Sequence, residues 1–236
     1  MSISTDYLLG GRVKITQNAE GYRAGLDAVM LAAACPVHAG ETILDLGCGA
    51  GAAGLCVAAR VLGTRVIGIE IQAAQAELAR QNFVQNNFPG DIITADLRGY
   101  PFTADSFDHV ILNPPYHDAT RHDAPQNASR VTAFMADDLS AWLTAARRAG
   151  KTHGSITIIH RADAIMDILN NLDGFGAVEI IPLWPRASEQ AERIIIRARK
   201  GRKTPPTLHP GIVLHNADGT ETEISHNILR KGAEIT

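Results

Sequence analysis

The stretch from Thr42 to Leu62 has a residue pattern that is compatible with few folds. It begins with the apolar run Thr42–Leu46, continues through the glycine-rich turn Gly47-Cys48-Gly49-Ala50-Gly51, and ends in small residues that suit a helix. Glycines adopt positive φ and let a ligand approach the backbone, and the amides at a helix start attract polar or anionic groups. The pattern also fits the loose G-x-G-x-x-G/A fingerprint through Gly47, Gly49 and Ala52, a weak signal shared with dinucleotide enzymes. The stretch therefore predicts a nucleotide-binding turn between a strand and a helix.

Short apolar runs alternate with helix-compatible stretches along most of the chain. Strands are expected at 42–46, 66–70, 91–94, 108–112, 155–160, 177–181 and 193–198. Helix-compatible stretches such as 136–149 and 162–172 separate most of the runs, and the last two are placed to form a hairpin. This alternation predicts an α/β fold with a seven-stranded, mostly parallel sheet, helices on both faces and an antiparallel last strand.

Polar residues follow the second and third expected strands. Glu70 ends the run 66–70, at about the distance from the glycines where dinucleotide folds place an acid that binds ribose hydroxyls. Asp96-Leu97 follows the third strand and offers a carboxylate and a main-chain amide to an adenine edge. Glu70 alone also fits a solvated strand end. The combination with the glycine turn favours a ligand role.

The sequence Asn113-Pro114-Pro115-Tyr116 follows the apolar run 110–112, where a buried parallel strand should end. Open α/β sheets place their ligands at that edge. The prolines hold the Asn113 side-chain carbonyl and the Pro114 backbone carbonyl as a rigid acceptor pair. Such a pair can accept both hydrogens of a planar NH2 group while the Tyr116 ring stacks on the attached π-system. Taken alone, the segment also fits an ordinary strand-ending turn.

Together these motifs resemble the S-adenosylmethionine-dependent amino-methyltransferases over roughly residues 40 to 200. The resemblance implies a Rossmann-like class I methyltransferase with S-adenosyl-L-methionine as its cofactor. It implies that Asn113, Pro114, Pro115 and Tyr116 orient an amine or amide nitrogen for methylation. The residues then expected to bind the cofactor are Arg23, Asp45, Gly47, Cys48, Gly49, Gly51, Glu70, Ile71, Asp96, Leu97 and Asn113. For Arg23, which would meet the cofactor carboxylate, a surface loop position is the alternative.

Leu8-Leu9-Gly10-Gly11-Arg12, the segment 21–29 and the Asn113–Tyr116 motif are similar to the bacterial tRNA-adenine N6-methyltransferases that modify the base beside a valine tRNA anticodon. The chain departs from them at 22–27, where that family more often has a lysine and a small hydroxyl residue. One alternative is methylation of a protein glutamine or of guanine N2 in rRNA. Release-factor glutamine methyltransferases carry a helical domain before the core, and roughly forty residues leave no room for one. Another alternative is a non-catalytic or NAD-binding Rossmann protein.

Length and composition suit one structural domain, because 236 residues with 45% hydrophobic content can bury a full α/β core. Within it we expect an N-terminal extension over 1–40 that packs on the core, a methyltransferase domain over 41–203 and a short C-terminal appendage over 204–236. No apolar stretch reaches the ~18 residues of a membrane span, and the polar start lacks a signal-peptide profile, so a cytoplasmic protein is expected. Monomer and homodimer both stay open.

Cysteine and histidine spacings argue against a metal site. Cys35, Cys48 and Cys56 form neither a C-x-x-C pair nor an even framework, which predicts free thiols. The densest histidine cluster, His117-Asp118 and His122-Asp123, lacks the spacing of zinc sites, so no metal is expected. Residues 117–130 instead predict a polar loop that covers or contacts the substrate.

Basic residues are unevenly distributed, although the formal net charge of −3 argues against a uniformly basic nucleic-acid binder. Seven of the eighteen residues from Arg186 to Lys203 are Arg or Lys, and Arg147, Arg148 and Lys151 form a second group. The 186–203 cluster is expected to contact RNA, and solvated strand-edge cations are the other interpretation. The expected partner is an RNA, with a tRNA anticodon loop implied by the narrower resemblance.

Overall fold

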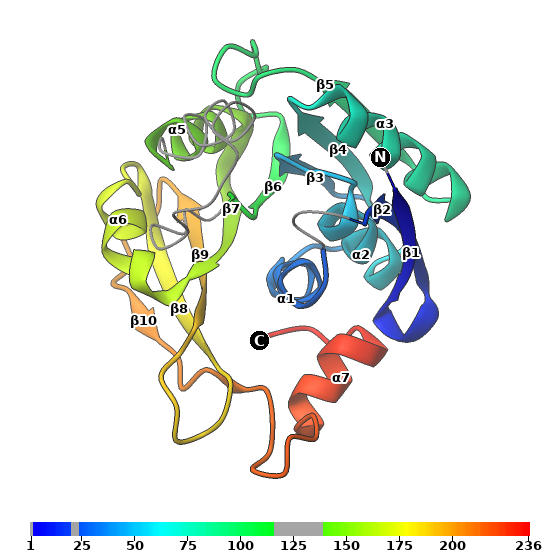
Figure 1. Ribbon diagram of the computed structural model, residues 1–236. Coiled ribbons are helices and arrows are strands. Elements are labelled where there is room, and N and C mark those ends of the chain that lie inside the picture. Colours follow the sequence, from blue (N-terminus) through cyan, green and yellow to red (C-terminus); the bar gives the residue numbers. More distant parts are fainter. Residues whose placement is uncertain (1, 20–23, 116–138) are drawn as a thin grey trace, which may run out of the picture.

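The seven expected apolar runs form neighbouring strands of one sheet in the computed structural model, which describes residues 2–19, 24–115 and 139–236 (Figure 1). They are β3 (Thr42–Leu46), β4 (Arg65–Glu70), β5 (Gly90–Thr94), β6 (Phe107–Leu112), β7 (Gly150–Arg161), β8 (Phe175–Trp184) and β9 (Arg193–Lys200). Their order across the sheet is β8-β9-β7-β6-β3-β4-β5, and β9 runs antiparallel to both of its neighbours. The predicted α/β fold is confirmed, including its antiparallel last strand.

The sheet is wider than predicted, because two short strands pair in parallel with β8. They are β10 (Thr207–Leu208) and β11 (Ile212–Val213), which bring the sheet to nine strands. A strand of two residues shows no alternation of apolar and polar side chains, so its sequence gives no periodic signal. The prolines nearby, Pro205, Pro206 and Pro210, predicted only irregular structure.

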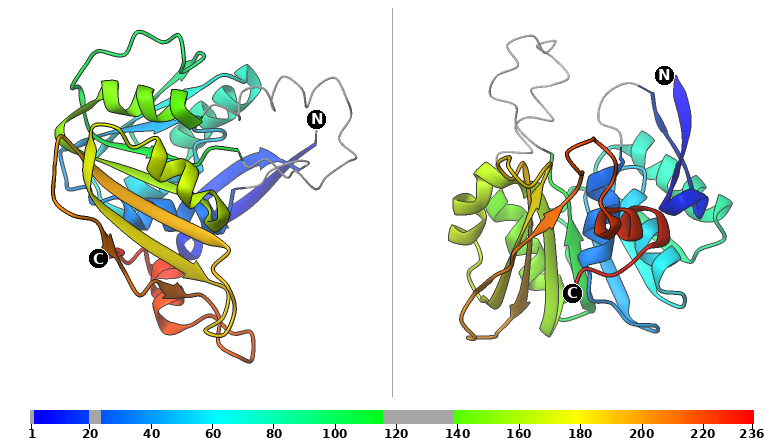
Figure 2. Two further views of the ribbon diagram at one scale, coloured as in Figure 1. Left: turned by 90° about the vertical axis from the view of Figure 1, so that its left-hand side faces the viewer. Right: turned by 90° about the horizontal axis from the view of Figure 1, so that it is seen from below.

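Helices cover both faces of the sheet, as the sequence predicted (Figure 2). One face carries α1 (Leu26–Ala34), α2 (Ala52–Arg60) and α3 (Ala73–Gln85), and the other carries α5 (Leu139–Ala149) and α6 (Ile165–Asn170). Strand β6 serves both cores, because Ile111 packs in the first and its neighbours Val110 and Leu112 in the second. The helix expected at 162–172 is divided into a 3₁₀ turn, η2 (Ala162–Ala164), and α6.

Both ends of the chain add to the core beneath α1 and α2. Strands β1 (Ile3–Leu8) and β2 (Val13–Asn18) form an antiparallel ribbon, and Val13 and Ile15 of β2 are fully buried. Helix α7 (Glu223–Lys231) follows β11 and buries Ile228 in the same cluster. The domain boundaries at 40 and 203 stay predictions.

The turn that joins the two strands of the ribbon, η1 (Leu9–Gly11), binds α2 and α7 together. The Arg12 guanidinium donates to the carbonyls of Ala59 and Lys231, which belong to these two helices. A Cβ on Gly10, whose φ is +63°, would lie 2.7 Å from the Arg230 carbonyl oxygen. The Leu8–Arg12 motif therefore has a packing role in this fold.

Candidate functional site

The carboxyl ends of four neighbouring parallel strands meet at one edge of the sheet. Leu46 of β3 pairs in register with Leu112 of β6 and with Ile69 of β4, and Glu70 pairs with Thr94 of β5. Gly47 and Asn113 therefore leave adjacent strands at the same level. The glycine turn, Glu70, Asp96 and the Asn-Pro-Pro segment lie along this carboxyl edge, where the sequence expected them.

The glycine turn, residues 47–51, is held by its own backbone bonds. The Cys48 amide donates to the Ile69 carbonyl over 3.1 Å, and the Gly51 amide donates to the Cys48 carbonyl over 2.8 Å. Gly51 is the N-cap of α2 and has a φ of +86°, which favours glycine. The turn is thus a preformed cradle, and these two amides are already used inside it.

Glu70 and Asp45 are two buried acids that flank the cradle, at 6% and 3% exposure. The Glu70 carboxylate accepts the Gly49 amide over 3.0 Å and the Gln72 amide over 2.8 Å, so it connects the cradle to the start of α3. Asp45 accepts the Gly54 amide of α2 over 3.1 Å. Burial, together with the nearby charge of Glu70, raises the pKa of Asp45 to about 7 although the Gly54 bond opposes the shift.

Trp142 of α5 lies against the cradle and was not identified from the sequence. A Cβ placed on Gly47 would lie 2.2 Å from the tip of the Trp142 ring, so only glycine fits there with the ring in place. Cys48 fills the space above Gly68 of β4, since a Cβ on Gly68 would lie 2.8 Å from its sulfur. Cys48 is buried and is a free thiol, as predicted, and its predicted contact with the cofactor stays a prediction.

Asn82 of α3 is a second site residue that sequence patterns missed. Its side chain is fully buried, and its Nδ2 donates to the carbonyls of Ala50 and Thr16, each over 2.8 Å. Its Oδ1 accepts the Thr16 amide over 2.8 Å. Asn82 therefore fastens the glycine turn to β2. An Asn inside a long polar helix carries no motif, so only the position of the ribbon reveals this role.

The third acid, Asp96, follows β5 and is paired with Arg98. Bonds from the Arg98 side chain hold the pKa of Asp96 below its usual value. Leu97 packs on the core beneath α5, and Ile71 is 40% exposed at the end of β4. Asp96 must exchange or share its Arg98 bonds if it is to bind an adenine edge.

Asn113 is partly buried, Pro114 is buried and Pro115 is exposed at the end of β6. Asn113 makes contacts with the rest of the protein, so it is anchored where the strand ends. Tyr116, the loop 117–130 and Arg23 lie outside the described residues, and their expected roles stay predictions.

The cradle at the carboxyl edge is acidic where a dinucleotide site would need donors. A pyrophosphate carries negative charge and binds to free amides of a glycine turn at a helix start. Here the Gly49 amide is already bonded to a carboxylate, and Asp45 and Glu70 are buried beside it. Such a site suits a ligand that carries positive charge and hydroxyl donors.

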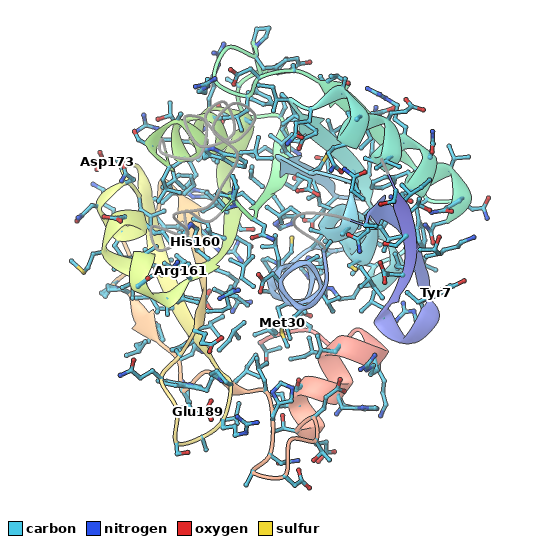
Figure 3. The ribbon with its side chains drawn as sticks, viewed as in Figure 1. Tyr7, Met30, His160, Arg161, Asp173 and Glu189 are labelled. Carbon is cyan, nitrogen blue, oxygen red and sulfur yellow. The ribbon has the colours of Figure 1, made fainter. Side chains whose placement is uncertain are left out.

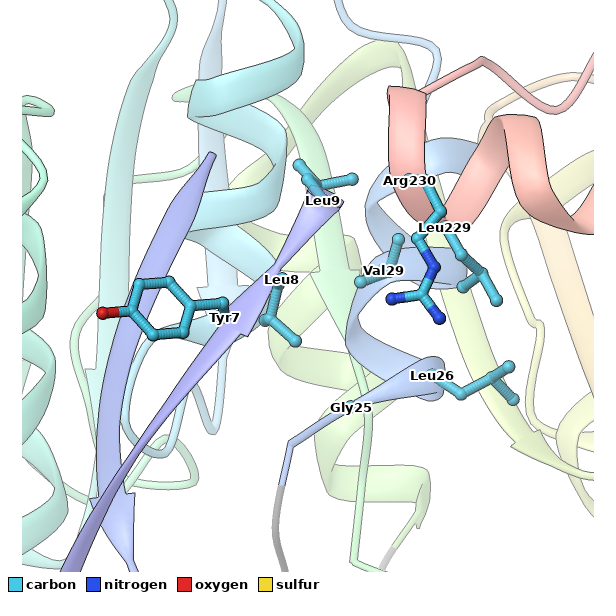
Figure 4. Close-up of a pocket in the computed structure, with 8 residues that line it drawn as sticks. All are labelled: Tyr7, Leu8, Leu9, Gly25, Leu26, Val29, Leu229 and Arg230. Atoms are coloured by element: carbon cyan, nitrogen blue, oxygen red, sulfur yellow. The ribbon is translucent and has the colours of Figure 1, made fainter. Parts of the chain in front are cut away.

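Other features of the described residues are weaker candidates for a functional site than this edge. A cavity of about 160 Å³ lies between the ribbon, α1 and α7 and is lined by residues such as Tyr7, Leu26 and Arg230 (Figure 4). That volume is below the ~300 Å³ of a typical small-molecule pocket. Within the described ranges, no group of three or more His, Cys, Asp or Glu residues could hold a metal ion. The same ranges contain no helix that is long and apolar enough to cross a membrane.

The predicted RNA cluster at 186–203 is not one surface. Arg193 pairs with Asp27 over 3.2 Å and faces Arg161, the last residue of β7, which Figure 3 labels. Arg199 faces Ser155, six residues earlier along β7 and toward the amino edge. Arg197 is 8% exposed and bonded to Glu179 and to the Ile235 carbonyl, so it is a buried structural residue. Treating the cluster as a single contact was wrong, because an antiparallel strand carries its two ends to opposite edges.

Comparison with known proteins agrees with this geometry. The family model for the methyltransferase small domain matches residues 25–161. A predicted O-methyltransferase from Agrobacterium tumefaciens is 26% identical, with a TM-score of 0.76 over 89% of this chain and 98% of that one.

Two more distant structures share the fold. A tRNA (m1A58) methyltransferase from Aquifex aeolicus is 15% identical, with a TM-score of 0.58 over 80% of this chain and 73% of that one. An S-adenosylmethionine-dependent O-methyltransferase from Thermotoga maritima is 19% identical, with a TM-score of 0.56 over 78% and 68%. A search of curated proteins found no match.

Proposed function

The chain belongs to the methyltransferase small domain family, and from that premise we propose that it methylates the exocyclic N6 amine of an adenine in RNA, with a tRNA anticodon loop as substrate. It is an S-adenosylmethionine-dependent methyltransferase with the Rossmann-like class I fold. The observation that carries the proposal is the position of Asn113-Pro114 at the end of β6, level with the glycine turn that ends β3.

The residues at the carboxyl edge fit S-adenosyl-L-methionine, which supplies, when bound, a methyl group on a positively charged sulfur. The buried carboxylate of Glu70, with Asp45 beside it, suits the net positive charge of that cofactor. Each Glu70 oxygen accepts one backbone amide and retains a lone pair for a ribose hydroxyl. Glu70 would hold the ribose, and Asp96 with Leu97 would meet the adenine.

An amine fits the Asn-Pro-Pro segment better than a hydroxyl does. The Asn113 amide oxygen and the Pro114 carbonyl are two acceptors, and an exocyclic NH2 group offers two hydrogens, whereas a hydroxyl offers one. A methyltransferase that acts on a hydroxyl also needs a base to remove its proton. The segment contributes none, which favours N-methylation over the O-methylation named for the Agrobacterium protein.

The proposed mechanism depends on positioning and on electrostatics. A purine amine is a weak nucleophile because its lone pair is conjugated with the ring. Two acceptors that hold both N–H bonds orient that lone pair and stabilise the positive charge that develops on the nitrogen. The proton leaves only after the nitrogen has become cationic, so water can take it.

An RNA base reaches this edge only if it is unstacked, as in a hairpin loop. The same segment would also hold the amide of a glutamine or the N2 amine of a guanine. The similarity of the Leu8–Arg12 and Asn113–Tyr116 motifs to tRNA-adenine enzymes favours adenine in tRNA.

Mass spectrometry of nucleosides tests the proposal. Total tRNA would be incubated with the enzyme and isotope-labelled S-adenosylmethionine, with heat-inactivated enzyme as the control, and then digested. We expect label in N6-methyladenosine. Label in N2-methylguanosine, or in a protein glutamine when cell protein is added, would contradict the adenine assignment.

A further inference from the structure

Seven cations gather at the amino edge of the sheet, the end opposite the glycine turn, and we call them the basic edge. Five are exposed and two are partly buried. They come from the end of α5, the start of β7, the end of β9 and the residues just after it, and these three elements lie side by side in Figure 2. The members are Arg147, Arg148, Lys151, Arg199, Lys200, Arg202 and Lys203.

Hydrogen bonds join these residues into one surface. Lys200 Nζ donates to the Gly150 carbonyl over 2.9 Å, which brings the end of β9 against the residue after α5. Arg199 donates to the His153 carbonyl over 3.4 Å, and Arg147 to the Asp173 carbonyl over 3.3 Å. Residues from three elements thus form one continuous edge, near the Asp173 labelled in Figure 3.

Most of this charge is not neutralised by the protein. Lys151 pairs with Asp108 over 2.6 Å, and Lys200 pairs with Asp105 over 3.0 Å. Within residues 2–19, 24–115 and 139–236, the other five make no ion pair with a carboxylate. Five exposed cations without counterions, in a chain whose net charge is −3, mark a surface for a polyanion.

Four of those five cations are arginines, whose planar guanidinium groups match phosphate oxygens in a bidentate manner. The basic edge is separated from the carboxyl edge by the six residues of β6, or about 20 Å at ~3.3 Å per residue. No single nucleotide spans that distance. A duplex of that length carries about a dozen phosphates.

We propose that the basic edge is a second RNA-binding surface, which grips the phosphate backbone of the stem that carries the methylated loop. The proposal rests on the RNA substrate proposed above and adds a contact remote from the methyl-transfer site. It explains how an enzyme with an acidic cofactor cradle can bind a polyanion. The surface that binds the RNA backbone and the site of methyl transfer lie at opposite ends of the sheet.

Salt-dependent binding tests the proposal. The variant Arg199→Glu/Arg202→Glu/Lys203→Glu would be compared with Lys14→Glu/Arg230→Glu/Lys231→Glu, which makes the same change in net charge elsewhere on the surface. Fluorescence anisotropy would measure the dissociation constant of an anticodon stem-loop RNA from 50 to 300 mM salt, without cofactor. Each lost phosphate contact lowers the log–log slope by about 0.7–0.9, so the first variant should lose about 2–3.

The control variant should keep most of the parent slope, and both variants should bind S-adenosylmethionine as the parent does. A parent that does not bind the RNA, a first variant with the parent slope, or equal losses in both variants would overturn the proposal. If the parent binds the stem-loop as expected but transfers no methyl group to adenine, the proposed function fails and the basic edge stands.

Discussion

Two buried carboxylates determine the electrostatics of the cofactor edge at the scale of single residues. Glu70 uses both oxygens to hold backbone amides on either side of β4, and Asp45 is bonded to the start of α2. Neither is a solvated strand-end acid. The spacing of Glu70 from the glycines predicted a ligand role, but the bonds that make it part of the cradle depend on chain segments meeting in space.

Glu70→Gln should weaken S-adenosylmethionine binding by about 10- to 100-fold, because a hydrogen bond to a charged group is worth about 1.5–3 kcal/mol. Calorimetric titration measures the affinity. The matched control is Glu77→Gln, the same change on the exposed side of α3, where the carboxylate binds only the side chains of Arg80 and Gln81 among the described residues. A folded Glu70→Gln protein with the parent affinity would remove Glu70 from the cofactor site.

Asp45 should make stability depend on pH. Its pKa is raised to about 7 in the folded protein and is about 3.9 when unfolded, so the unfolded chain loses this proton first. The contribution to stability is therefore fully present below about pH 4 and is lost as the pH rises through about 7. In urea titrations, the unfolding free energy of the parent should fall relative to Asp45→Asn between pH 4.5 and 7.5, by an amount on the order of a few kcal/mol. A constant difference would show that Asp45 is charged throughout.

Secondary-structure elements differ in how well they could be predicted from the sequence. Strands β3, β4 and β6 are apolar runs of five or six residues beside glycine or proline signals, and their ends lie within one residue of the prediction. Only one side of the β1–β2 ribbon is buried. Hydrogen bonds from the side-chain amide of Asn82 in α3 connect the ribbon to the core. Such long-range bonds have no local signal, so its form was not predicted.

Asn82→Ala tests whether α3 holds both the ribbon and the glycine turn. It leaves the Ala50 and Thr16 carbonyls and the Thr16 amide without this partner, and each buried unpaired group costs about 1–3 kcal/mol. We expect a loss of at least about 2 kcal/mol in the unfolding free energy, measured by urea titration, and weaker cofactor binding.

Asn86→Ala is the matched control for this change. Asn86 caps the end of α3, one turn after Asn82, and makes the equivalent bonds to the amide and carbonyl of Lys14. Its side chain also donates to the Asn82 carbonyl, but it makes no hydrogen bond to the glycine turn within the described residues. It should reduce stability less and leave the cofactor affinity unchanged. Equal cofactor affinities in folded Asn82→Ala and parent proteins would show that the cradle holds its shape without α3.

The whole molecule separates its two tasks along the strands of the sheet. The mostly parallel sheet predicted from the alternating pattern was enough to place the glycine turn and Asn113 at one edge. It was not used to follow β9, whose antiparallel course puts Arg193 at the cofactor edge and Arg199 at the opposite one. The clustering of basic residues along the sequence therefore gave the wrong surface. When the charged residues are grouped by the edge of the sheet at which they lie, both the acidic cradle and the basic edge appear.

Asn113 decides whether the cofactor edge positions an amine. Asn113→Ala removes the side-chain acceptor but leaves the glycine turn, Asp45 and Glu70 in place, so S-adenosylmethionine should bind as in the parent. Removal of one preorganised polar group from a transition state costs about 10²- to 10³-fold in rate. The change should therefore appear in the chemical step and not in cofactor affinity.

The decisive measurement is the single-turnover rate of methyl transfer to adenine N6 in an anticodon stem-loop RNA, with enzyme and S-adenosylmethionine in excess. We expect Asn113→Ala to be slower than the parent by about 10²-fold or more at equal cofactor occupancy. An Asn113→Ala protein that methylates adenine at the parent rate would contradict the amine-positioning mechanism and reduce the Asn-Pro-Pro segment to a turn that ends β6.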